Sequence, residues 1–125
     1  MRRILITGAS GAIGGALAER YASGGVELHL HGRDVSRLEA LAARCRAKGA
    51  EVHCHALDLR DASLVRSWVA ALCEHASFDL IIIGAGVNTN IGEAGQGEPW
   101  REVESLLAVN LTATMAIVDA ALPSM

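Results

Sequence analysis

The sequence predicts one α/β domain over residues 1–125, in which parallel strands alternate with helices that cover both faces of the sheet. Two observations indicate this fold class. Aliphatic runs of strand length alternate along the chain with segments whose apolar residues recur at helical spacing. The first aliphatic run also leads through a glycine-rich turn directly into an Ala- and Leu-rich helix, which begins a strand–helix–strand unit. With 51% hydrophobic residues and a net charge of −3, the chain can form a packed core.

The first strand ends in a turn that is suited to bind a pyrophosphate. We expect Gly8 to adopt the positive φ angle that a tight turn needs, and Gly11 to let the backbone approach a phosphate with no Cβ in between. Gly14 would let the following helix pack closely on the sheet. The free N–H groups near Ala12 and Ile13, at the positive end of the helix dipole, would then face the anion. The alternative is an ordinary tight corner between a strand and a helix.

The remaining elements follow from apolar spacing and from capping residues. The predicted strands are Ile4–Ile6, Val26–His31, Glu51–Leu57 and Phe78–Ile83. The predicted helices are 13–22, a helix capped by Asp34 or Ser36 and ended by Gly49, a helix capped by Asp61, and a helix that begins at Pro99. The apolar faces predicted for the last three helices are Leu38, Leu41, Ala42 and Cys45; Leu64, Val65, Trp68, Val69 and Leu72; and Val103, Leu106, Leu107, Leu111, Met115 and Val118.

The glycine turn also carries a resemblance to a known family. The stretch 7–14 reads Thr-Gly-Ala-Ser-Gly-Ala-Ile-Gly and resembles the nucleotide-binding fingerprint of the short-chain dehydrogenase/reductase family. Ala12 stands where the commoner family pattern has glycine, and the glycines have the Gly-x-x-Gly-x-x-Gly spacing of other branches. The resemblance implies a Rossmann-like doubly wound sheet in the strand order 3-2-1-4 and a nicotinamide dinucleotide cofactor. The cofactor-binding residues that it implies in this turn are Thr7, Gly8, Ser10, Gly11, Ala12, Ile13 and Gly14.

The residues after the second and third strands determine which form of the cofactor the resemblance implies. Arg33 follows Gly32 at the end of the second strand, and its guanidinium can bind a 2′-phosphate with two hydrogen bonds. We therefore expect NADP(H), with NAD(H) as the alternative. In the family an aspartate after the third strand binds the adenine amino group, which assigns this role to Asp58 and a nearby backbone contact to Leu59. The alternatives are a solvated arginine beside a helix start and a plain loop carboxylate.

The end of the fourth strand and the last helix carry the rest of the resemblance. Ala85 and Gly86 match the end of the family's Asn-Asn-Ala-Gly, close to the ribose and the nicotinamide, whereas both asparagines of that pattern are absent. Asn110 interrupts the apolar face of the last helix and matches the catalytic asparagine that holds a water in the proton relay. The alternative is a buried amide in a satisfied structural kink. Residues 88–98 are predicted to form a mobile loop that covers a substrate, or to be disordered.

The resemblance implies hydride transfer between a nicotinamide and an alcohol or carbonyl compound, with a serine and a Tyr-x-x-x-Lys pair for the acid–base chemistry. The chain has one tyrosine, Tyr21, and one lysine, Lys48, and residue 25 is glycine. The residues therefore exclude this pair, and we expect the cofactor-binding half of an oxidoreductase, truncated before the fifth strand. The alternatives are a dinucleotide-binding module without turnover and an inactive truncated product that oligomerises.

Charge and hydropathy indicate which partners to expect. Nothing in the composition points to nucleic acid. No apolar run is expected to approach the roughly 20 residues of a membrane span, and Arg2 and Arg3 lead straight into a strand, so we expect no membrane partner and a cytoplasmic protein. The outer edge of the fourth strand is bare, and an open aliphatic edge invites pairing. We therefore expect a homo-oligomer that buries the fourth strand, the last helix or both.

The cysteines and histidines are the candidate metal ligands. The three cysteines are odd in number and widely spaced, which fits reduced core residues. His29 and His31 on one strand, and His53 and His55 on another, each lie at i, i+2 and would form one patch if the two strands are neighbours. We expect no bound metal, because no carboxylate or thiolate is seen to complete a coordination sphere. The alternative is adventitious binding of nickel or zinc.

Overall fold

The computed structural model describes residues 1–87, 97 and 99–125. Its strands are β1 (Arg2–Thr7), β2 (Val26–His31), β3 (Glu51–His55) and β4 (Leu80–Ile83). Its helices are α1 (Ala12–Tyr21), α2 (Val35–Ala47), α3 (Ala62–His75), α4 (Trp100–Leu107), the π-helical η2 (Ala108–Thr112), α5 (Ala113–Ala121) and the short 3₁₀ helix η3 (Leu122–Ser124). Apart from residue 97, the loop predicted at 88–98 lies outside the described residues.

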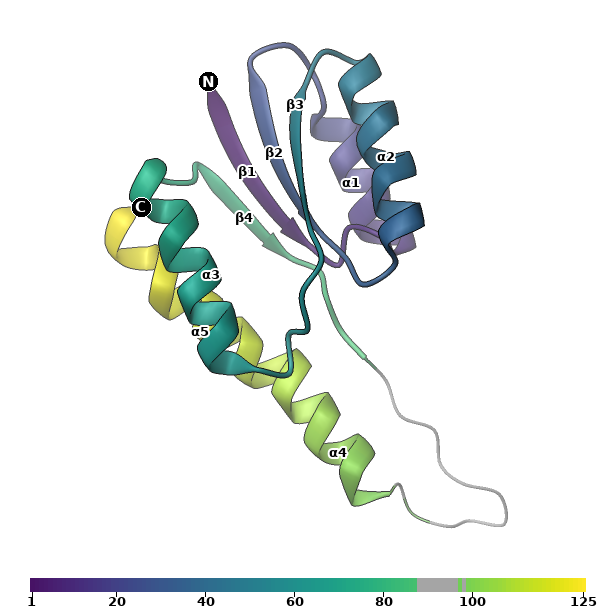
Figure 1. Cartoon of the computed structure of the whole chain (residues 1–125), viewed down its shortest axis with the longest axis vertical. Helices are drawn as coiled ribbons and strands as arrows, with labels where there is room; N and C mark the ends of the chain where they lie inside the picture. Colours follow the sequence, from purple (N-terminus) through teal and green to yellow (C-terminus); the bar gives the residue numbers. More distant parts are fainter. Residues whose placement is uncertain (88–96, 98) are drawn as a thin grey trace.

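The four strands form one parallel sheet in the order β3-β2-β1-β4, which confirms the predicted strand order. Figure 1 shows α1 and α2 on one face of this sheet and α3 and α5 on the other, so the sheet is doubly wound. Because all four strands are parallel, their carboxyl ends meet at one edge of the sheet, and the loops that follow them lie close together.

The predicted caps position α2 and α3. The carboxylate of Asp34 accepts a hydrogen bond from the N–H of Arg37 at 3.1 Å, and that of Asp61 accepts one from the N–H of Leu64 at 3.1 Å. Each aspartate thereby satisfies one of the free N–H groups at a helix start. Gly49 follows the end of α2 with a φ of 94°, a left-handed conformation that favours glycine.

The face of the sheet under α1 and α2 is an aliphatic layer. Ile4 and Ile6 of β1 are in register with Leu28 and Leu30 of β2, and all four side chains are fully buried. The buried helix residues that pack against this layer are Ala18, Leu38, Leu41, Ala42 and Cys45. The apolar face predicted for the second helix is therefore confirmed.

The opposite face changes character across the sheet. Over β1 and β4 a second apolar cluster contains Leu5 and Phe78 together with residues of α3 and α5. Over β2 and β3 the side chains are polar, because every second residue of these strands is Glu or His. The predicted histidine patch is confirmed: the ring of His29 stacks on those of His53 and His55, with centroids 4.8 and 5.2 Å apart. We call the six residues Glu27, His29, His31, Glu51, His53 and His55 the polar face.

The last helix packs with a different face from the one predicted. The buried residues of η2 and α5 are Val109, Ala113, Ala116, Ile117 and Ala121. Four residues of the predicted face, Leu107, Leu111, Met115 and Val118, are instead 40–59% exposed. The prediction chose the large apolar residues that recur at helical spacing as the buried face. The structure buries the alanine-rich face instead, because alanines let α5 lie directly beside α3. Leu64 of the third helix was also expected to face the sheet but is 46% exposed in the first turn of α3.

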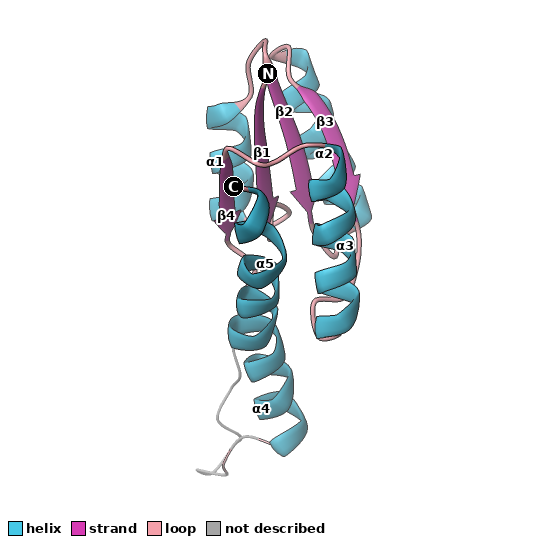
Figure 2. Cartoon of the chain, turned by 90° about the vertical axis from the view of Figure 1, so that its left-hand side faces the viewer, coloured by secondary structure: helices cyan, strands magenta, loops and turns pink. Residues whose placement is uncertain are grey.

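The segment from α4 to η3 forms one long apolar helix. Figures 1 and 2 show α4 extending beyond the ends of the strands, and none of its residues is buried. Trp100–Ser124 is long and apolar enough to cross a membrane by length and composition, and an 18-residue window within it has a mean hydropathy of 1.7. The expectation that no apolar run approaches this length was therefore wrong. A core helix of a soluble protein passes the same test, so one such helix is weak evidence for a membrane.

Candidate functional site

A cleft of about 400 Å³ opens at the carboxyl ends of the strands. Its walls are formed by the four loops that follow β1, β2, β3 and β4, and by residues of the last helix. The predicted cofactor-binding residues that line it are Gly8, Ser10, Gly11, Arg33, Asp58, Leu59, Ala85 and Gly86. The fold therefore brings together residues from four separate stretches of the sequence.

The three glycines of the turn after β1 are needed for different reasons. Gly8 has a φ of 69°, and a Cβ there would lie 2.6 Å from the N of Ala85. A Cβ on Gly14 would lie 2.3 Å from the carbonyl oxygen of Gly8, so only glycine lets α1 approach the turn this closely. Gly11 differs, because its φ is −81° and a Cβ would lie 3.4 Å from the carbonyl oxygen of Gly8, which is an ordinary contact. Packing within the chain therefore explains Gly8 and Gly14 and leaves Gly11 unexplained.

His31 connects two of the loops that form the cleft. Its Nδ1 accepts a hydrogen bond from the N–H of Gly8 at 3.3 Å, and its Nε2 donates one to the carbonyl of Leu57 at 2.9 Å. Since a backbone N–H can only donate and a carbonyl can only accept, these partners require the neutral Nε2–H tautomer. Burial lowers the pKa of His31, which agrees with a neutral ring. His31 thus fixes the glycine turn relative to the loop that holds Asp58.

The charged residues of the cleft favour an anion. Arg33 and Arg37 line it from the end of β2 and the first turn of α2. Asp58 is paired with Arg60, whose Nη2 lies 2.6 Å from its Oδ2. The hydrogen bonds from Arg60 lower the pKa of Asp58 to about 2, so the carboxylate is ionised at neutral pH. The pairing balances the charge of Asp58 and leaves the positive charge of Arg33 facing the cleft.

Four predicted residues lie outside the lining of the cleft: Gly14, which packs against the turn, and Thr7, Ala12 and Ile13. Thr7 is fully buried, and its Oγ1 accepts a hydrogen bond from the N–H of Ala85 at 3.3 Å, which ties the turn after β1 to the loop after β4. Ala12 and Ile13 begin α1, and the side chain of Ile13 is 78% exposed. Gly11 precedes them and has no side chain to cap the helix, so the first N–H groups of α1 are free for an anion.

Asn110 lies in the π-helical segment η2. Its Oδ1 accepts a hydrogen bond from the N–H of Val87, and its Nδ2 donates one to the carbonyl of the same residue, both at 2.8 Å. The amide is therefore satisfied, as in the alternative of a structural kink, but Asn110 is exposed rather than buried. The bonds to Val87 hold η2 against the loop after β4, next to Gly86.

A family model described as short chain dehydrogenase matches residues 2–125. The chain belongs to the short-chain dehydrogenase family. It is 33% identical over 125 residues to an uncharacterized oxidoreductase of Myxococcus xanthus, and the match covers 99% of the chain and 49% of that protein. The chain therefore spans about half the length of this relative.

Solved structures of the family superpose closely on this chain. A metagenomic short-chain oxidoreductase in complex with NADP gives a TM-score of 0.89 at 31% identity, over 99% of this chain and 56% of that one. An NAD⁺-bound xylitol dehydrogenase gives a TM-score of 0.85 at 26% identity, over 99% of this chain and 48% of that one. These proteins contain NADP and NAD⁺ respectively, which supports a nicotinamide dinucleotide as the cofactor class.

Sequence reasoning missed several polar residues that line the cleft, among them His31, Arg37 and Arg60. His31 was considered only as a metal ligand. The sequence could have indicated its place in the cleft, because His31 is the last residue of a strand, directly before Gly32. Residues at such positions face the loops at the edge of the sheet. The sequence gives no comparable indication for Arg37, three residues after a helix cap, or for Arg60, two residues after an aspartate. Surface arginines at such positions are common.

Proposed function

We propose that this chain forms the dinucleotide half-site of an oxidoreductase that transfers a hydride between NADP(H) and an alcohol or carbonyl compound. Gly11 carries the proposal. Among the residues that the structure describes, neither its backbone conformation nor its neighbours require glycine, yet it stands directly before the first N–H groups of α1. A methyl group at this position would occupy the space in which a pyrophosphate contacts the helix start. The absence of a side chain at Gly11 therefore serves a ligand.

The preference for NADP(H) over NAD(H) rests on Arg33. This exposed arginine follows β2, where the adenosine ribose of a dinucleotide lies in this fold, and Arg37 stands beside it in the cleft. Asp34, the acidic residue nearest to this position, already accepts a hydrogen bond from the N–H of Arg37 as the cap of α2. A 2′-phosphate thus has a guanidinium to bind, whereas a free 2′-hydroxyl would have to compete for a carboxylate that is in use.

Calorimetric titration of the chain with NADPH and with NADH tests the proposal. The wild-type chain should bind NADPH more tightly than NADH, and Arg33→Ala should remove this difference. Gly11→Ala should weaken both cofactors at least about tenfold, because its methyl group displaces the phosphates. Gly24→Ala is the matched control: nothing lies within 4 Å of a Cβ there, so the variant should bind like the wild type. Wild-type affinity in Gly11→Ala would contradict the proposed site.

Asn110 is the residue that we assign to the proton relay, as the holder of a water molecule. Its amide is occupied by Val87, which fixes the position of η2 beside the cleft. The serine, tyrosine and lysine that complete the acid–base chemistry in the family would come from sequence outside residues 1–125. We therefore expect turnover only from a longer chain.

A dinucleotide-binding module without turnover is the second candidate, and the positions of Tyr21 and Lys48 favour it for the chain as given. The Tyr21 ring packs against the guanidinium of Arg2, 5.4 Å away, and Lys48 Nζ donates to the carbonyl of Glu19 at 2.9 Å. Neither side chain lines the cleft. Oxidation of NADPH by this chain with a panel of carbonyl compounds would contradict this candidate, and binding without turnover would support it.

We also propose that copies of the chain associate. Leu107, Leu111, Met115, Val118 and Leu122 form an exposed stripe along one side of the last helix, with successive spacings of four, four, three and four residues. This spacing is typical of helices that pair along a seam, and a second copy offers the same stripe. The outer edge of β4 is a second candidate contact. Burial of the stripe between copies also agrees with the cytoplasmic location that we propose, and light scattering at micromolar concentration tests the association.

A further inference from the structure

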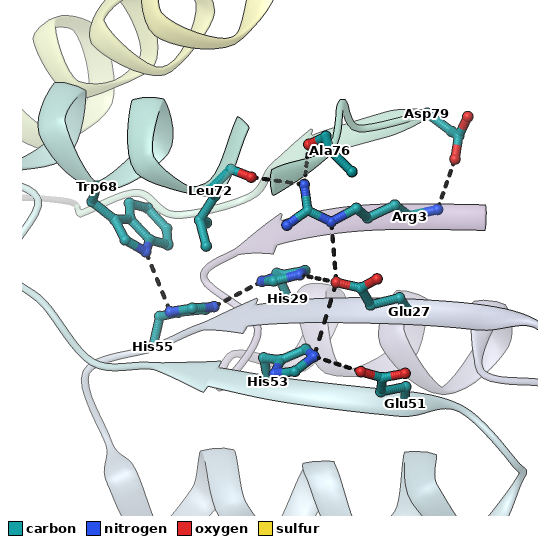
Figure 3. Close-up of polar contacts among 10 residues, drawn as sticks. All are labelled: Arg3, Glu27, His29, Glu51, His53, His55, Trp68, Leu72, Ala76 and Asp79. Carbon is teal, nitrogen blue, oxygen red and sulfur yellow. Dashed lines mark hydrogen bonds and ion pairs between the residues drawn. The ribbon is translucent and has the colours of Figure 1, made fainter. Parts of the chain in front are cut away.

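Three metal-ligating side chains meet on the polar face, away from the cleft. Glu27 Oε1 lies 2.5 Å from His29 Nε2 and 3.9 Å from His53 Nε2, and the three ligand atoms all lie within 4.8 Å of one another (Figure 3). Glu27 and His29 share a face because they are two residues apart in β2, and the parallel register places His53 of β3 beside His29. Glu27 supplies the carboxylate that the sequence analysis found lacking, so that part of the analysis was wrong.

We propose that Glu27, His29 and His53 bind a zinc-type divalent cation. Two imidazoles and one carboxylate are a donor set that Zn²⁺ takes in proteins. With bonds of about 2.0–2.1 Å, tetrahedral ligand atoms stand about 3.3 Å apart, which lies between the 2.5 and 3.9 Å found here. The ligand atoms lie at most 4.8 Å apart, and the His53 side chain is 44% exposed, so it can move toward the other two ligands and the ion can enter from solvent.

The surrounding charges favour a cation. Glu51 Oε1 lies 3.0 Å from His53 Nε2 and adds a second carboxylate to the cluster. Arg3 is the opposing charge, because its Nε donates to Glu27 Oε1 at 3.0 Å. Two carboxylates against one guanidinium leave one negative charge for the ion to neutralise.

The protonation states also suit a metal site, because ligands must be free of protons to bind. Burial lowers the pKa of His29, which favours the neutral form of its ring. Burial alone would raise the pKa of Glu27, but the hydrogen bonds from His29 and Arg3 hold it below its ordinary value, so the carboxylate is ionised. Both imidazoles carry a proton on the nitrogen that would bind, because Nε2 of His29 faces Glu27 Oε1 and Nε2 of His53 faces Glu51 Oε1, and a carboxylate can only accept. Each ring must therefore carry its proton on Nδ1 once the ion is bound, and for His29 the neighbouring side chains determine how.

A chain of hydrogen bonds determines where that proton lies. The indole N–H of Trp68 can only donate, and it lies 3.3 Å from Nδ1 of His55, which therefore accepts. His55 then carries its proton on Nε2 and donates it to Nδ1 of His29, 3.0 Å away. His29 in turn carries its proton on Nε2, which faces Glu27. Figure 3 shows this chain from Trp68 to Glu27.

Cation binding must reverse the direction of the hydrogen bond between His55 and His29. A metal ion on His29 Nε2 takes the place of that proton, so His29 carries its proton on Nδ1 and donates it to His55 Nε2. This outer hydrogen bond would orient the ligand, as such bonds do in metal sites. His55 then carries a proton on Nδ1, directly opposite the N–H of Trp68, and the hydrogen bond between these two groups is lost. Trp68 therefore opposes cation binding and reports on it.

The cation would lie far from the cofactor cleft. Glu27 and Glu51 are in register at the amino-terminal parts of β2 and β3, whereas the cleft lies at the carboxyl ends of the strands. The ion would link β2 to the edge strand β3 and stabilise this part of the sheet. We therefore expect zinc to raise the Tm of the chain and to leave its affinity for NADPH unchanged.

Calorimetric titration of the chain with zinc chloride tests the site, with cobalt chloride as a visible-absorption probe of coordination. The wild type should bind one ion per chain, and His53→Gln should weaken binding at least about tenfold. His75→Gln makes the same change at an exposed histidine at the end of α3, and it should bind like the wild type. His53 is half exposed, so its variant should remain folded. A wild-type chain that binds no zinc, or a His53→Gln variant that binds it equally well, would overturn the proposal.

Trp68→Phe gives a second and opposite readout. Phenylalanine keeps most of the ring packing against His55. It removes the indole N–H that would face the proton on Nδ1 of His55 when the cation is bound. The variant should therefore bind zinc several-fold more tightly than the wild type, whereas loss of a merely structural contact would weaken binding. Equal or weaker binding by Trp68→Phe would overturn the assignment of His29 as a ligand.

Discussion

The two faces of this sheet are stabilised in different ways, although the same strands form both. Toward α1 and α2, β2 presents Leu28 and Leu30, which are fully buried in an aliphatic layer. Toward α3 the same strand presents residues of the polar face, where His29 and His31 are nearly as buried but bound to specific partners. Burial stabilises the first face in proportion to apolar area, whereas hydrogen bonds to particular atoms hold the second. Substitutions that remove side-chain volume should therefore destabilise the first face most. Substitutions that remove a hydrogen-bond partner should destabilise the second face most.

The largest effect is expected on the aliphatic face. Leu30→Ala removes a fully buried side chain and should lower the free energy of unfolding by about 3 kcal/mol, because it leaves a cavity in a packed layer. His53→Gln on the polar face should change it by less than about 0.5 kcal/mol. Urea denaturation of both variants measures the difference. Similar losses in the two variants would remove the contrast between the faces.

A buried residue of the polar face should give a smaller loss of a different kind. His31→Leu keeps the bulk of the side chain but leaves the N–H of Gly8 and the carbonyl of Leu57 without their partner, at a cost of about 2 kcal/mol in unfolding free energy.

The same variant should also weaken NADPH binding, since His31 fixes the turn and the loop that line the cleft. Leu30→Ala should bind NADPH like the wild type under conditions in which it is folded. Calorimetric titration distinguishes the two, and unchanged NADPH affinity in His31→Leu would contradict the positioning role.

The exposed side of the last helix belongs to neither face and should contribute little to the single chain. Leu111→Lys should change the unfolding free energy of the monomer by less than about 0.5 kcal/mol, because the side chain it replaces is 57% exposed. It should nevertheless convert the associated form to monomer in light scattering, since it puts a charge in the apolar stripe. A large stability loss in dilute, monomeric protein would show that the stripe packs within the chain.

The smallest expected effect concerns Asp58 at the edge where the two faces meet. Arg60 lowers the pKa of this carboxyl from 3.8 to about 2, so the ionised form is favoured in the folded chain. The resulting stabilisation is complete above pH 4, is lost as the pH falls toward 2, and is slight because both side chains are exposed. Carboxyl ¹³C shifts should show Asp58 titrating near pH 2 in the wild type and at a higher pH in Arg60→Ala, although the N–H of residue 60 still donates to the carboxylate in the variant. Equal titration in both would contradict the pairing.

Much of the site could be predicted because its determinants are local. The alternation of aliphatic runs and helical stripes indicated the strands, and Gly8 and Gly14 lie where a strand turns closely into a helix. Arg33, Asp58 and Ala85 could be assigned to the cleft because each follows a parallel strand, and such strand ends share one edge. His31 escaped prediction, because its two partners lie 23 and 26 residues away.

The sequence by itself determined the elements and the glycine turn, since these depend on residue spacing and on backbone conformations that neighbouring residues allow, and the family resemblance added the order of the strands in the sheet. Only the tertiary structure decided which side of the last helix is buried, because small alanines and large leucines repeat at the same period and the approach of α3 selects between them. It also decided that Glu27, His29 and His53 meet. The alternation of side chains along a strand determines which face of the sheet each one lies on. The register between β2 and β3 determines which side chains are neighbours, and that register depends on the packing of the whole sheet.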